Sequence, residues 1–364
     1  MLLPESMLAL TTISEGGLPH DVAGSLESNL GERMAVVRTG VPEPMPGEVL
    51  LRVEAAGVNR ADVLQALGVY HVPQGASAIL GLEAAGEVLA VGEGVDGGLV
   101  GSLRVALLNG GGQAQYCAVP LSLTLPVPVL PDRTDACMSG AALMESMATV
   151  QMAMDAAKAC MPAGRGLTSV LVHGASGGVG AVAVQMARAL GWSVVATAGD
   201  DMRCAKVEML GAHKAVPYHD TAGIQGAVEE VTQGAGVDMV LDVMGAGGLE
   251  LNTSAVSNGG VITMIGLLKG VRGEIDLGRL LAKNATVRAM TLRSQSAGRK
   301  AEIVTALGNV FWPAIEKGEI RPVIAGTVPF RRAEKAHSWI LNKDVSESTD
   351  DQRPFGKIVL VQPW

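Results

Sequence analysis

The segment from Ser169 to Gly191 constrains the fold more than any other part of the sequence. It reads SVLVHGASGGVGAVAVQMARALG: a short apolar run rich in Val, a turn rich in Gly, and an apolar helical stretch. The turn carries Ala175, Gly177 and Gly180 as AxGxxG. Such a turn, set between a buried strand and a helix, is typical of a doubly wound α/β sheet.

This turn also predicts a binding site for a diphosphate. Gly177 lets the backbone approach the ligand closely, and Gly180 lets the helix pack tightly on the strand. The helix N-terminus offers N–H groups without partners and the positive end of a dipole. We therefore expect a Rossmann-type dinucleotide site on the residues of this turn: Ser176, Gly177, Gly178, Val179 and Gly180.

The pattern of predicted secondary structure changes near residue 141. From about 34 to 130 it has short β segments such as EVLLRVEAAGV between Gly and Pro turns, with little helical periodicity. From 141, helical and short Val-rich or Ile-rich stretches alternate, as in a parallel sheet: SVVATA, AVPY, VDMVLDVMG and GGVITMIG. We predict a helix around 300–318 and a surface loop at 344–355, DVSESTDDQRPF. The expected domains are 1–143 with 291–364, mostly β, and 144–290, Rossmann-type.

Composition narrows the possible partners. The net charge of −8 provides no basic surface for nucleic acid, so a small molecule is the expected ligand. The four cysteines lack CxxC spacing, which argues against a zinc lobe or a disulfide framework and favours a reducing cytoplasm. We expect no membrane-spanning segment, because no apolar run is long enough.

The end of the second strand bears on which nicotinamide dinucleotide binds. NAD-specific sites place an acidic residue there, and this chain has Ala198. Without that carboxylate a 2′-phosphate is not repelled, and Arg203 is positioned in sequence to pair with it. Asp200 either caps the following helix or repels the phosphate. NADPH is favoured, and NADH stays open.

Several long segments in order resemble the zinc-free quinone oxidoreductase branch of the medium-chain dehydrogenase/reductase superfamily. They include GVNRADVLQALGVYHVPQGAS, ILGLEAAGEV, TAGDDMRCAKVEMLGA, LLAKNATVRAMTLRSQS and the closing GKIVLVQP. The resemblance covers nearly the whole chain. It implies a GroES-like substrate domain beside the Rossmann domain, and an oxidoreductase.

The resemblance also indicates the reaction site. Zinc-containing relatives hold the metal with a Cys and with the His of a GHE motif, and the matching residues here are Asn59 and Leu82, so no metal is expected. The residues that the resemblance places around the nicotinamide are Asn59, Asp62, Tyr70 and Thr149. Tyr70 also matches the catalytic Tyr segment of zinc-free mitochondrial enoyl reductases. The alternative for Asn59 and Asp62 is hydrogen bonding within the local turn.

Further cofactor contacts follow from the resemblance by matched position: Tyr218 near the adenosine phosphate, Gly266 and Leu267 near the nicotinamide amide, and Lys357. For Tyr218 and Lys357 a plain surface role is the alternative. His173, just before the Gly turn, is expected to be a hydrogen-bonded histidine at a strand end rather than a catalyst.

The predicted activity is hydride transfer from NADPH to a quinone or a related electron-poor carbonyl compound. An enoyl-thioester or enone reductase is the alternative enzyme, and an NADPH-binding structural or RNA-binding protein is the alternative without catalysis. Relatives in this branch form homodimers through the edge strands of their nucleotide domains. We expect the apolar strand VITMIG, 261–266, to form that edge.

Overall fold

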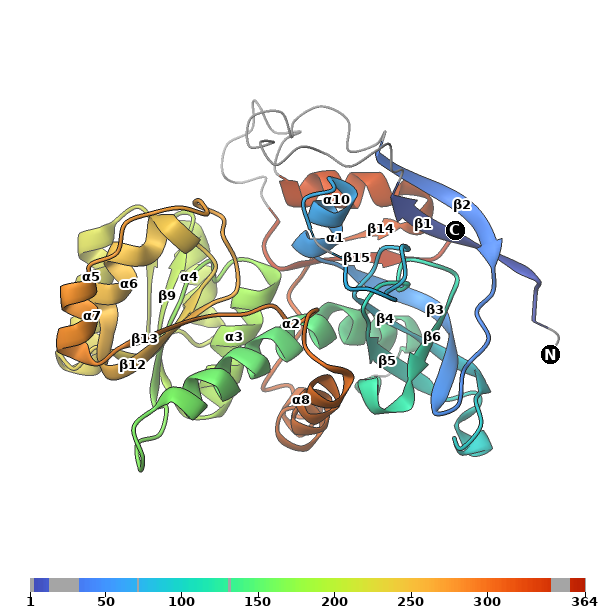
Figure 1. Cartoon of the computed structure of the whole chain (residues 1–364), viewed down its shortest axis with the longest axis horizontal. Coiled ribbons are helices and arrows are strands. Elements are labelled where there is room, and N and C mark those ends of the chain that lie inside the picture. Colours follow the sequence, from blue (N-terminus) through green and yellow to red (C-terminus); the bar gives the residue numbers. More distant parts are fainter. Residues whose placement is uncertain (1–2, 13–32, 71, 130–131, 342–353, 364) are drawn as a thin grey trace. The chain divides into compact units, whose positions relative to one another are not determined.

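The computed structural model describes residues 3–12, 33–70, 72–129, 132–341 and 354–363. The chain forms two compact units (Figure 1). The first comprises Met1–Glu145, Ser296–Gly308 and Ile324–Trp364, and the second comprises Ser146–Gln295 and Asn309–Val323. The domain boundaries expected from the sequence stay a prediction, and residues 344–353 of the expected surface loop lie outside the described part.

The first unit is built on a mostly antiparallel sheet. Its strand order is β14-β15-β3-β4-β5-β7, with β6 also paired to β3, and β1 and β2 form a separate antiparallel pair. Only β14 and β15 run parallel. The strands are β1 (Ser6–Thr12), β2 (Met34–Gly40), β3 (Glu48–Val58), β4 (Glu83–Val91), β5 (Leu103–Leu107), β6 (Tyr116–Pro120), β7 (Thr124–Pro126), β14 (Ile324–Pro329) and β15 (Lys357–Val361).

The core of this unit gathers around β3. Most of β3 is buried, with partly exposed residues only at Glu48, Arg52 and Glu54, and Val49, Leu51 and Val53 are completely buried. Phe330 and Leu360, from the far end of the sequence, belong to the same core cluster. The helices that begin in this unit are α1 (Arg60–Ala66), α2 (Arg133–Cys160), α8 (Ala297–Val310) and α10 (Ala333–Leu341). The mostly β first unit expected from the sequence is confirmed.

The second unit contains a six-stranded parallel sheet. Its order is β10-β9-β8-β11-β12-β13, and the chain reverses its lateral course across the sheet between β8 and β11. In open sheets of this kind, ligands bind at the carboxyl ends of the strands where the order reverses. The strands are β8 (Ser169–Val172), β9 (Ser193–Ala198), β10 (Lys214–Pro217), β11 (Val237–Asp242), β12 (Val256–Met264) and β13 (Thr286–Ala289).

Helices cover both faces of this parallel sheet. Figure 1 shows α5, α6 and α7 on one face and α3 on the other. Every residue of β8 and β11 is buried, which explains why both strands are rich in apolar residues, although β11 also buries Asp238 and Asp242. The helices are α3 (Gly178–Ala189), α4 (Asp201–Met209), α5 (Thr221–Thr232), α6 (Leu249–Ala255), α7 (Leu277–Lys283) and α9 (Trp312–Glu316).

Two expectations about individual elements are wrong. The single helix expected around 300–318 is two helices, α8 and α9, separated at Phe311. Pro313 stands in the first turn of α9, where its missing N–H costs nothing but where it prevents a continuous helix. The strand VITMIG is not an edge, since β12 lies between β11 and β13. The mostly exposed β13 is the edge strand on that side of the sheet, and its lack of an apolar run hid it in the sequence.

Candidate active site

The strand β3 leads directly into the candidate reaction site of the first unit. Asn59 follows β3 and caps the N-terminus of α1. The carboxylate of Asp62 accepts hydrogen bonds from the backbone N–H of Asn59 at 2.8 Å and of Gly81 at 2.9 Å. Asp62 is completely buried, and burial raises its pKa to about 6, although these two hydrogen bonds lower it. Asp62 therefore bonds within its own turn, as its alternative describes, and also ties that turn to the loop at Gly81, which the alternative did not include.

A buried lysine lies against Asn59. The Nζ of Lys357, the first residue of β15, donates to Oδ1 of Asn59 and lies 2.7 Å from Oε1 of Glu83 and 3.8 Å from Oε2 of Glu145. The side chains of Lys357 and Glu83 are 5% and 0% exposed. Burial alone would lower the pKa of Lys357, but the two carboxylates raise it above its ordinary value. The ammonium is therefore charged, and its charge is matched locally.

These contacts fix the orientation of the Asn59 amide. Its Oδ1 accepts from Lys357, and its Nδ2 donates to Oε1 of Glu83 at 3.0 Å. The other oxygen of Glu83 accepts from the backbone N–H of Glu145 at 2.8 Å. An amide nitrogen carries two N–H groups. One N–H of Asn59 is thus left to donate to a further acceptor such as a carbonyl oxygen.

Gly57 has no side chain and so leaves space for the carboxylate of Glu83. A Cβ atom on Gly57, two residues before Asn59, would lie 2.2 Å from Oε1 of Glu83 and 2.3 Å from the carbonyl oxygen of Ala141. Any other residue would displace the carboxylate that holds Asn59 and Lys357. Sequence reasoning missed Glu83, although it stands beside Leu82 in the GLE segment that was compared with GHE.

Tyr70 and Thr149 are the other two residues that the sequence predicts around the nicotinamide. Tyr70 is half-buried in the loop that follows α1, in the same unit as Asn59. Thr149 is buried on α2, in the part of that helix that belongs to the second unit. The first unit thus brings together Asn59, Asp62 and Lys357, and the catalytic roles of Tyr70 and Thr149 stay predictions.

In the second unit the Gly turn has the geometry that its sequence predicts. Gly174 adopts a left-handed φ of +66°, and the N–H of Ala175 bonds to the carbonyl of Thr197 on β9 at 2.8 Å. Gly177 caps α3. A Cβ on Gly180 would lie 2.4 Å from the carbonyl oxygen of Gly174, so α3 packs on the turn as closely as backbone allows. The N–H groups of the first helical turn have no acceptor within the helix and suit an anion.

At the carboxyl end of β9, Asp200 and Arg203 form an ion pair. Asp200 caps α4 and accepts from the backbone N–H of Arg203 at 2.8 Å, as its capping alternative predicts. Its other oxygen lies 3.2 Å from Nε of Arg203, whose side chain is only 8% exposed. The positive charge of Arg203 is therefore balanced by Asp200. The backbone N–H of Tyr218 bonds to the carbonyl of Ala198 at 2.8 Å, which places Tyr218 at the same end of the sheet.

The loop after β12 pairs with the loop after β11. The N–H of Leu268 bonds to the carbonyl of Val243 at 3.0 Å, and the N–H of Lys269 bonds to that of Met244 at 2.7 Å. Gly266 is half-buried, and Leu267 is half exposed. The backbone pairing holds both residues at the carboxyl edge of the sheet, beside the end of β11.

His173 is a structural residue, as expected. Its Nδ1 lies 3.1 Å from Oγ1 of Thr197, and its Nε2 lies 2.7 Å from Oδ1 of Asn252. Burial lowers its pKa to about 4, the bond to Asn252 raises it and the charge of Lys269 lowers it further. The ring is neutral at pH 7 and joins the strand ends of β8 and β9 to α6.

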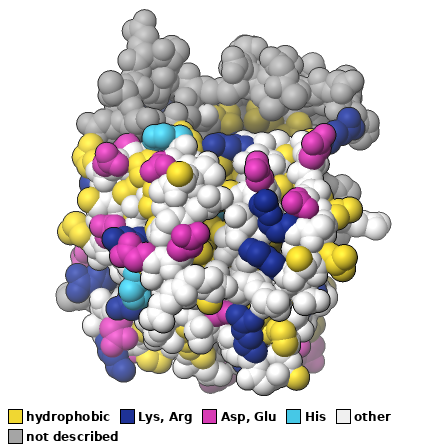
Figure 2. Space-filling model, turned by 90° about the vertical axis from the view of Figure 1, so that its left-hand side faces the viewer, with side chains coloured by type: hydrophobic (Ala, Val, Ile, Leu, Met, Phe, Trp, Pro, Cys, Tyr) yellow, Lys and Arg dark blue, Asp and Glu magenta, His cyan; other side chains and the backbone are white. Residues whose placement is uncertain are grey.

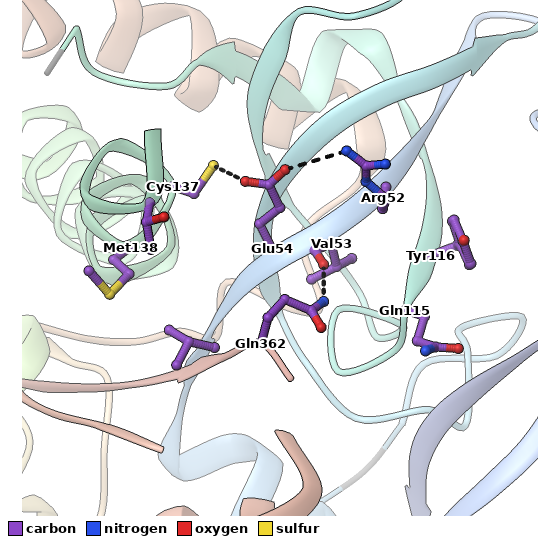
Figure 3. A pocket seen from close by; sticks show the side chains of 10 residues that line it. Arg52, Val53, Glu54, Gln115, Tyr116, Cys137, Met138 and Gln362 are labelled. Carbon is purple, nitrogen blue, oxygen red and sulfur yellow. Dashed lines mark hydrogen bonds and ion pairs between the residues drawn. The ribbon is translucent and has the colours of Figure 1, made fainter. Parts of the chain in front are cut away.

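A separate cavity of about 420 Å³ lies in the first unit (Figure 3). Arg52, Glu54 and Cys137 line it, and Figure 3 shows Glu54 between the other two. The thiol of Cys137 donates to Glu54 at 3.5 Å. None of the predicted site residues lines this cavity, so it is distinct from the cluster around Asn59.

Two stretches of the chain match known families, and the matches extend to whole proteins. Residues 45–129 match the alcohol dehydrogenase GroES-like domain, and residues 178–307 match the family described as zinc-binding dehydrogenase. A quinone oxidoreductase of Sus scrofa is 30% identical over 306 residues, which are 83% of this chain and 88% of that protein. A 2-haloacrylate reductase of a Burkholderia species is 30% identical over 312 residues, 82% of this chain and 89% of that protein.

A solved structure shows the same similarity. The quinone oxidoreductase from Thermus thermophilus, whose crystal structures include a complex with NADPH, is 31% identical to this chain. It aligns with a TM-score of 0.71 over 92% of this chain and 97% of its own.

The zinc ion in the name of one matched family does not fit the residues of this chain. Leu82 offers no ligand atom, and Oδ1 of Asn59 is bound to the ammonium of Lys357. Within the described residues, no group of three or more His, Cys, Asp or Glu side chains is arranged to hold a metal. A dication beside Lys357 would also be repelled by its charge.

Proposed function

This chain belongs to the zinc-free quinone oxidoreductase branch of the medium-chain dehydrogenase/reductase superfamily, and from that premise we propose that it transfers hydride from NADPH to a quinone. The observation that carries the proposal is the Asn59 amide, oriented by Lys357 and Glu83 with one N–H left to donate. A quinone is activated by conjugation, so it needs orientation and a hydrogen bond rather than a Lewis acid.

The chain's own residues divide the work. The bound cofactor supplies hydride. The backbone N–H groups at residues 176–180 hold its diphosphate, and Ala198 leaves the adenosine ribose free of a repelling carboxylate. Asn59 donates a hydrogen bond to the acceptor oxygen, and Tyr70 is the proposed proton donor. Thr149, Gly266 and Leu267 are proposed to line the nicotinamide site.

The test is the loss of NADPH absorbance in the presence of ortho- and para-quinones. Turnover with at least one of them, and slower turnover with NADH, is expected. Tight NADPH binding without turnover of any quinone would refute the acceptor class and leave the cofactor assignment intact. Stoichiometric zinc in the purified, active protein would refute the role given to Asn59 and Lys357.

A second candidate is reduction of an activated carbon–carbon double bond. The similarity to a 2-haloacrylate reductase favours it, because that relative matches this chain as extensively as the quinone oxidoreductase does. The same hydrogen bond from Asn59 would polarise the carbonyl or carboxyl group conjugated to the double bond. Steady-state rates on 2-haloacrylates, crotonyl thioesters and quinones, compared as kcat/KM, separate the two activities.

We propose a homodimer formed through β13. This strand is one of the two edge strands of the described parallel sheet, and an unpaired edge favours pairing with a second copy. Val287 on β13 and Leu281 on α7 are 38% and 80% exposed. Figure 2 shows hydrophobic side chains interspersed with charged ones on the side of this unit that carries α5 and α7. Backbone pairing, rather than a large apolar patch, would therefore hold the dimer, and sedimentation showing only monomer would refute it.

We also propose a cytoplasmic location. All four cysteines are free thiols, and three of them, Cys117, Cys137 and Cys204, are buried. Free thiols are typical of a reducing compartment. Within the described part of the chain, no helix combines the length and apolar character needed to cross a membrane. Cell fractionation followed by immunodetection tests the location directly.

A further inference from the structure

The charge at the adenosine end of the nucleotide site is the starting point. NADPH differs from NADH by a phosphate on the adenosine ribose, so a site that prefers NADPH needs a positive charge there. Arg203 is the cation that the sequence suggests, but Asp200 pairs with it at 3.2 Å and its side chain is 8% exposed. Arg203 alone therefore gives this end of the site little net positive charge.

A second cation reaches the same end from another loop. Nζ of Lys269 lies 4.3 Å from the centre of the Tyr218 ring. The backbone N–H of Tyr218 is bonded to Ala198, at the strand end where NAD-specific sites have their acidic residue. Lys269 is exposed, and no described carboxylate lies within ion-pair distance of its ammonium. Its charge is not balanced by the described part of the protein.

The backbone holds Lys269 in this position. Its N–H bonds to the carbonyl of Met244 at 2.7 Å, and its own carbonyl accepts from Gly247 at 3.1 Å. A Cβ on Gly247 would lie 2.7 Å from the Cβ of Lys269, so the two loops meet as closely as a glycine permits. A cation on a loop that is held by two backbone hydrogen bonds loses less conformational freedom when it binds a ligand than a cation on an unpaired loop does.

We propose that Lys269 is a specificity-determining residue, which pairs with the 2′-phosphate of NADPH beside Tyr218. The proposal rests on the proposed function, since it assumes a nicotinamide dinucleotide on the Gly turn. Tyr218 serves as a platform that keeps the ammonium at the adenosine end through a cation–π contact. Arg203, neutralised by Asp200, contributes hydrogen-bond donors rather than net charge.

The experiment measures binding of nucleotide fragments by calorimetry to the full-length protein. The probes are 2′,5′-ADP, which is adenosine 2′,5′-bisphosphate, and 5′-AMP, which differs from it only in lacking the 2′-phosphate. Lys269→Met is expected to weaken 2′,5′-ADP binding about tenfold or more and 5′-AMP binding less than about twofold. Lys269→Arg, which keeps the charge, is expected to restore most of the affinity. The matched control is Lys214→Met, since Lys214 is a half-exposed lysine on β10 that pairs with Glu230 at 3.1 Å.

Each other outcome overturns the proposal. Equal weakening for both probes would place Lys269 on the 5′-phosphate, which the two probes share. Unchanged binding in Lys269→Met, or equal weakening in Lys214→Met, would leave no specific contact. Failure of the wild-type protein to bind either probe would overturn the proposed function as well. Selective loss of 2′,5′-ADP binding in a protein that reduces no quinone would support Lys269 and refute the quinone assignment, so the two failures are distinguishable.

Discussion

Two ion-pair clusters in the first unit differ in how far water reaches them. In the cluster around Lys357, the side chains of Lys357 and Glu83 are 5% and 0% exposed. In the cluster around Arg133, that side chain is 46% exposed, and its partners Glu54 and Glu87 are 20% and 21% exposed. Buried charges cost much when one partner is lost, and exposed pairs contribute little. The first cluster can therefore fix an active-site amide, while the second mainly covers surface.

The largest expected effect is that of Lys357→Met. It leaves the buried carboxylate of Glu83 and the partly buried carboxylate of Glu145 without their cation, and we expect the free energy of unfolding to fall by about 3–5 kcal/mol. Denaturant titration measures this loss. Adding Glu83→Gln to the variant should recover part of it, and Lys214→Met should cost less than about 1 kcal/mol. A loss below about 1 kcal/mol for Lys357→Met would show that the buried ion pairs contribute no more to stability than the exposed ones.

Two histidines of the second unit also differ in burial, since His173 is buried and His213 is exposed. Burial lowers the pKa of His173 from 6.5 to about 4, so the folded state favours the neutral ring. Its contribution to stability is present above pH 6.5 and is lost as the pH falls through about 4, by up to about 3 kcal/mol. His173→Gln should therefore make the unfolding free energy less steep between these pH values. His213→Gln, at an exposed ring, should change the slope much less.

The third prediction tests what the buried cluster does for catalysis. Asn59→Ala removes the proposed donor to the acceptor oxygen, so we expect kcat for quinone reduction to fall about 100-fold, equivalent to about 2.7 kcal/mol, with NADPH affinity unchanged. Stopped-flow kinetics and cofactor titration measure the two quantities separately. Asn258→Ala, at an exposed side chain, is the control. Equal rates for the two variants would remove Asn59 from the mechanism.

The smallest effect is expected at the exposed cluster. Arg133→Met should lower the free energy of unfolding by less than about 1 kcal/mol, because water and salt screen the pairs with Glu54 and Glu87. Repeating the denaturation at high salt should shrink the difference further. A loss comparable with that of Lys357→Met would mean that exposure does not separate these clusters.

Local sequence determined the parts of the fold whose causes lie within a few residues. The Gly turn at 174–180 needs a left-handed Gly174 and a side-chain-free Gly180, and both requirements act between neighbours in the chain. The cap of α4 by Asp200 is likewise local. The Val-rich strands β8 and β11 are buried on both faces of one sheet. The sequence predicted the turn and these strands correctly because their patterns are short, and it gave the cap by Asp200 as one of two alternatives.

Tertiary structure decided what the candidate site contains. Lys357 reaches Asn59 across 298 positions of sequence, and no local pattern reveals such a contact. The edge position of β13 depends on the order of strands in the sheet, which strand propensity does not encode. Lys269 meets Tyr218 only because the loops after β12 and β10 converge at one edge. Charge pairing and packing between distant segments depend on the folded arrangement. The sequence therefore identifies the polar and charged side chains, and only the tertiary structure determines which of them are in contact.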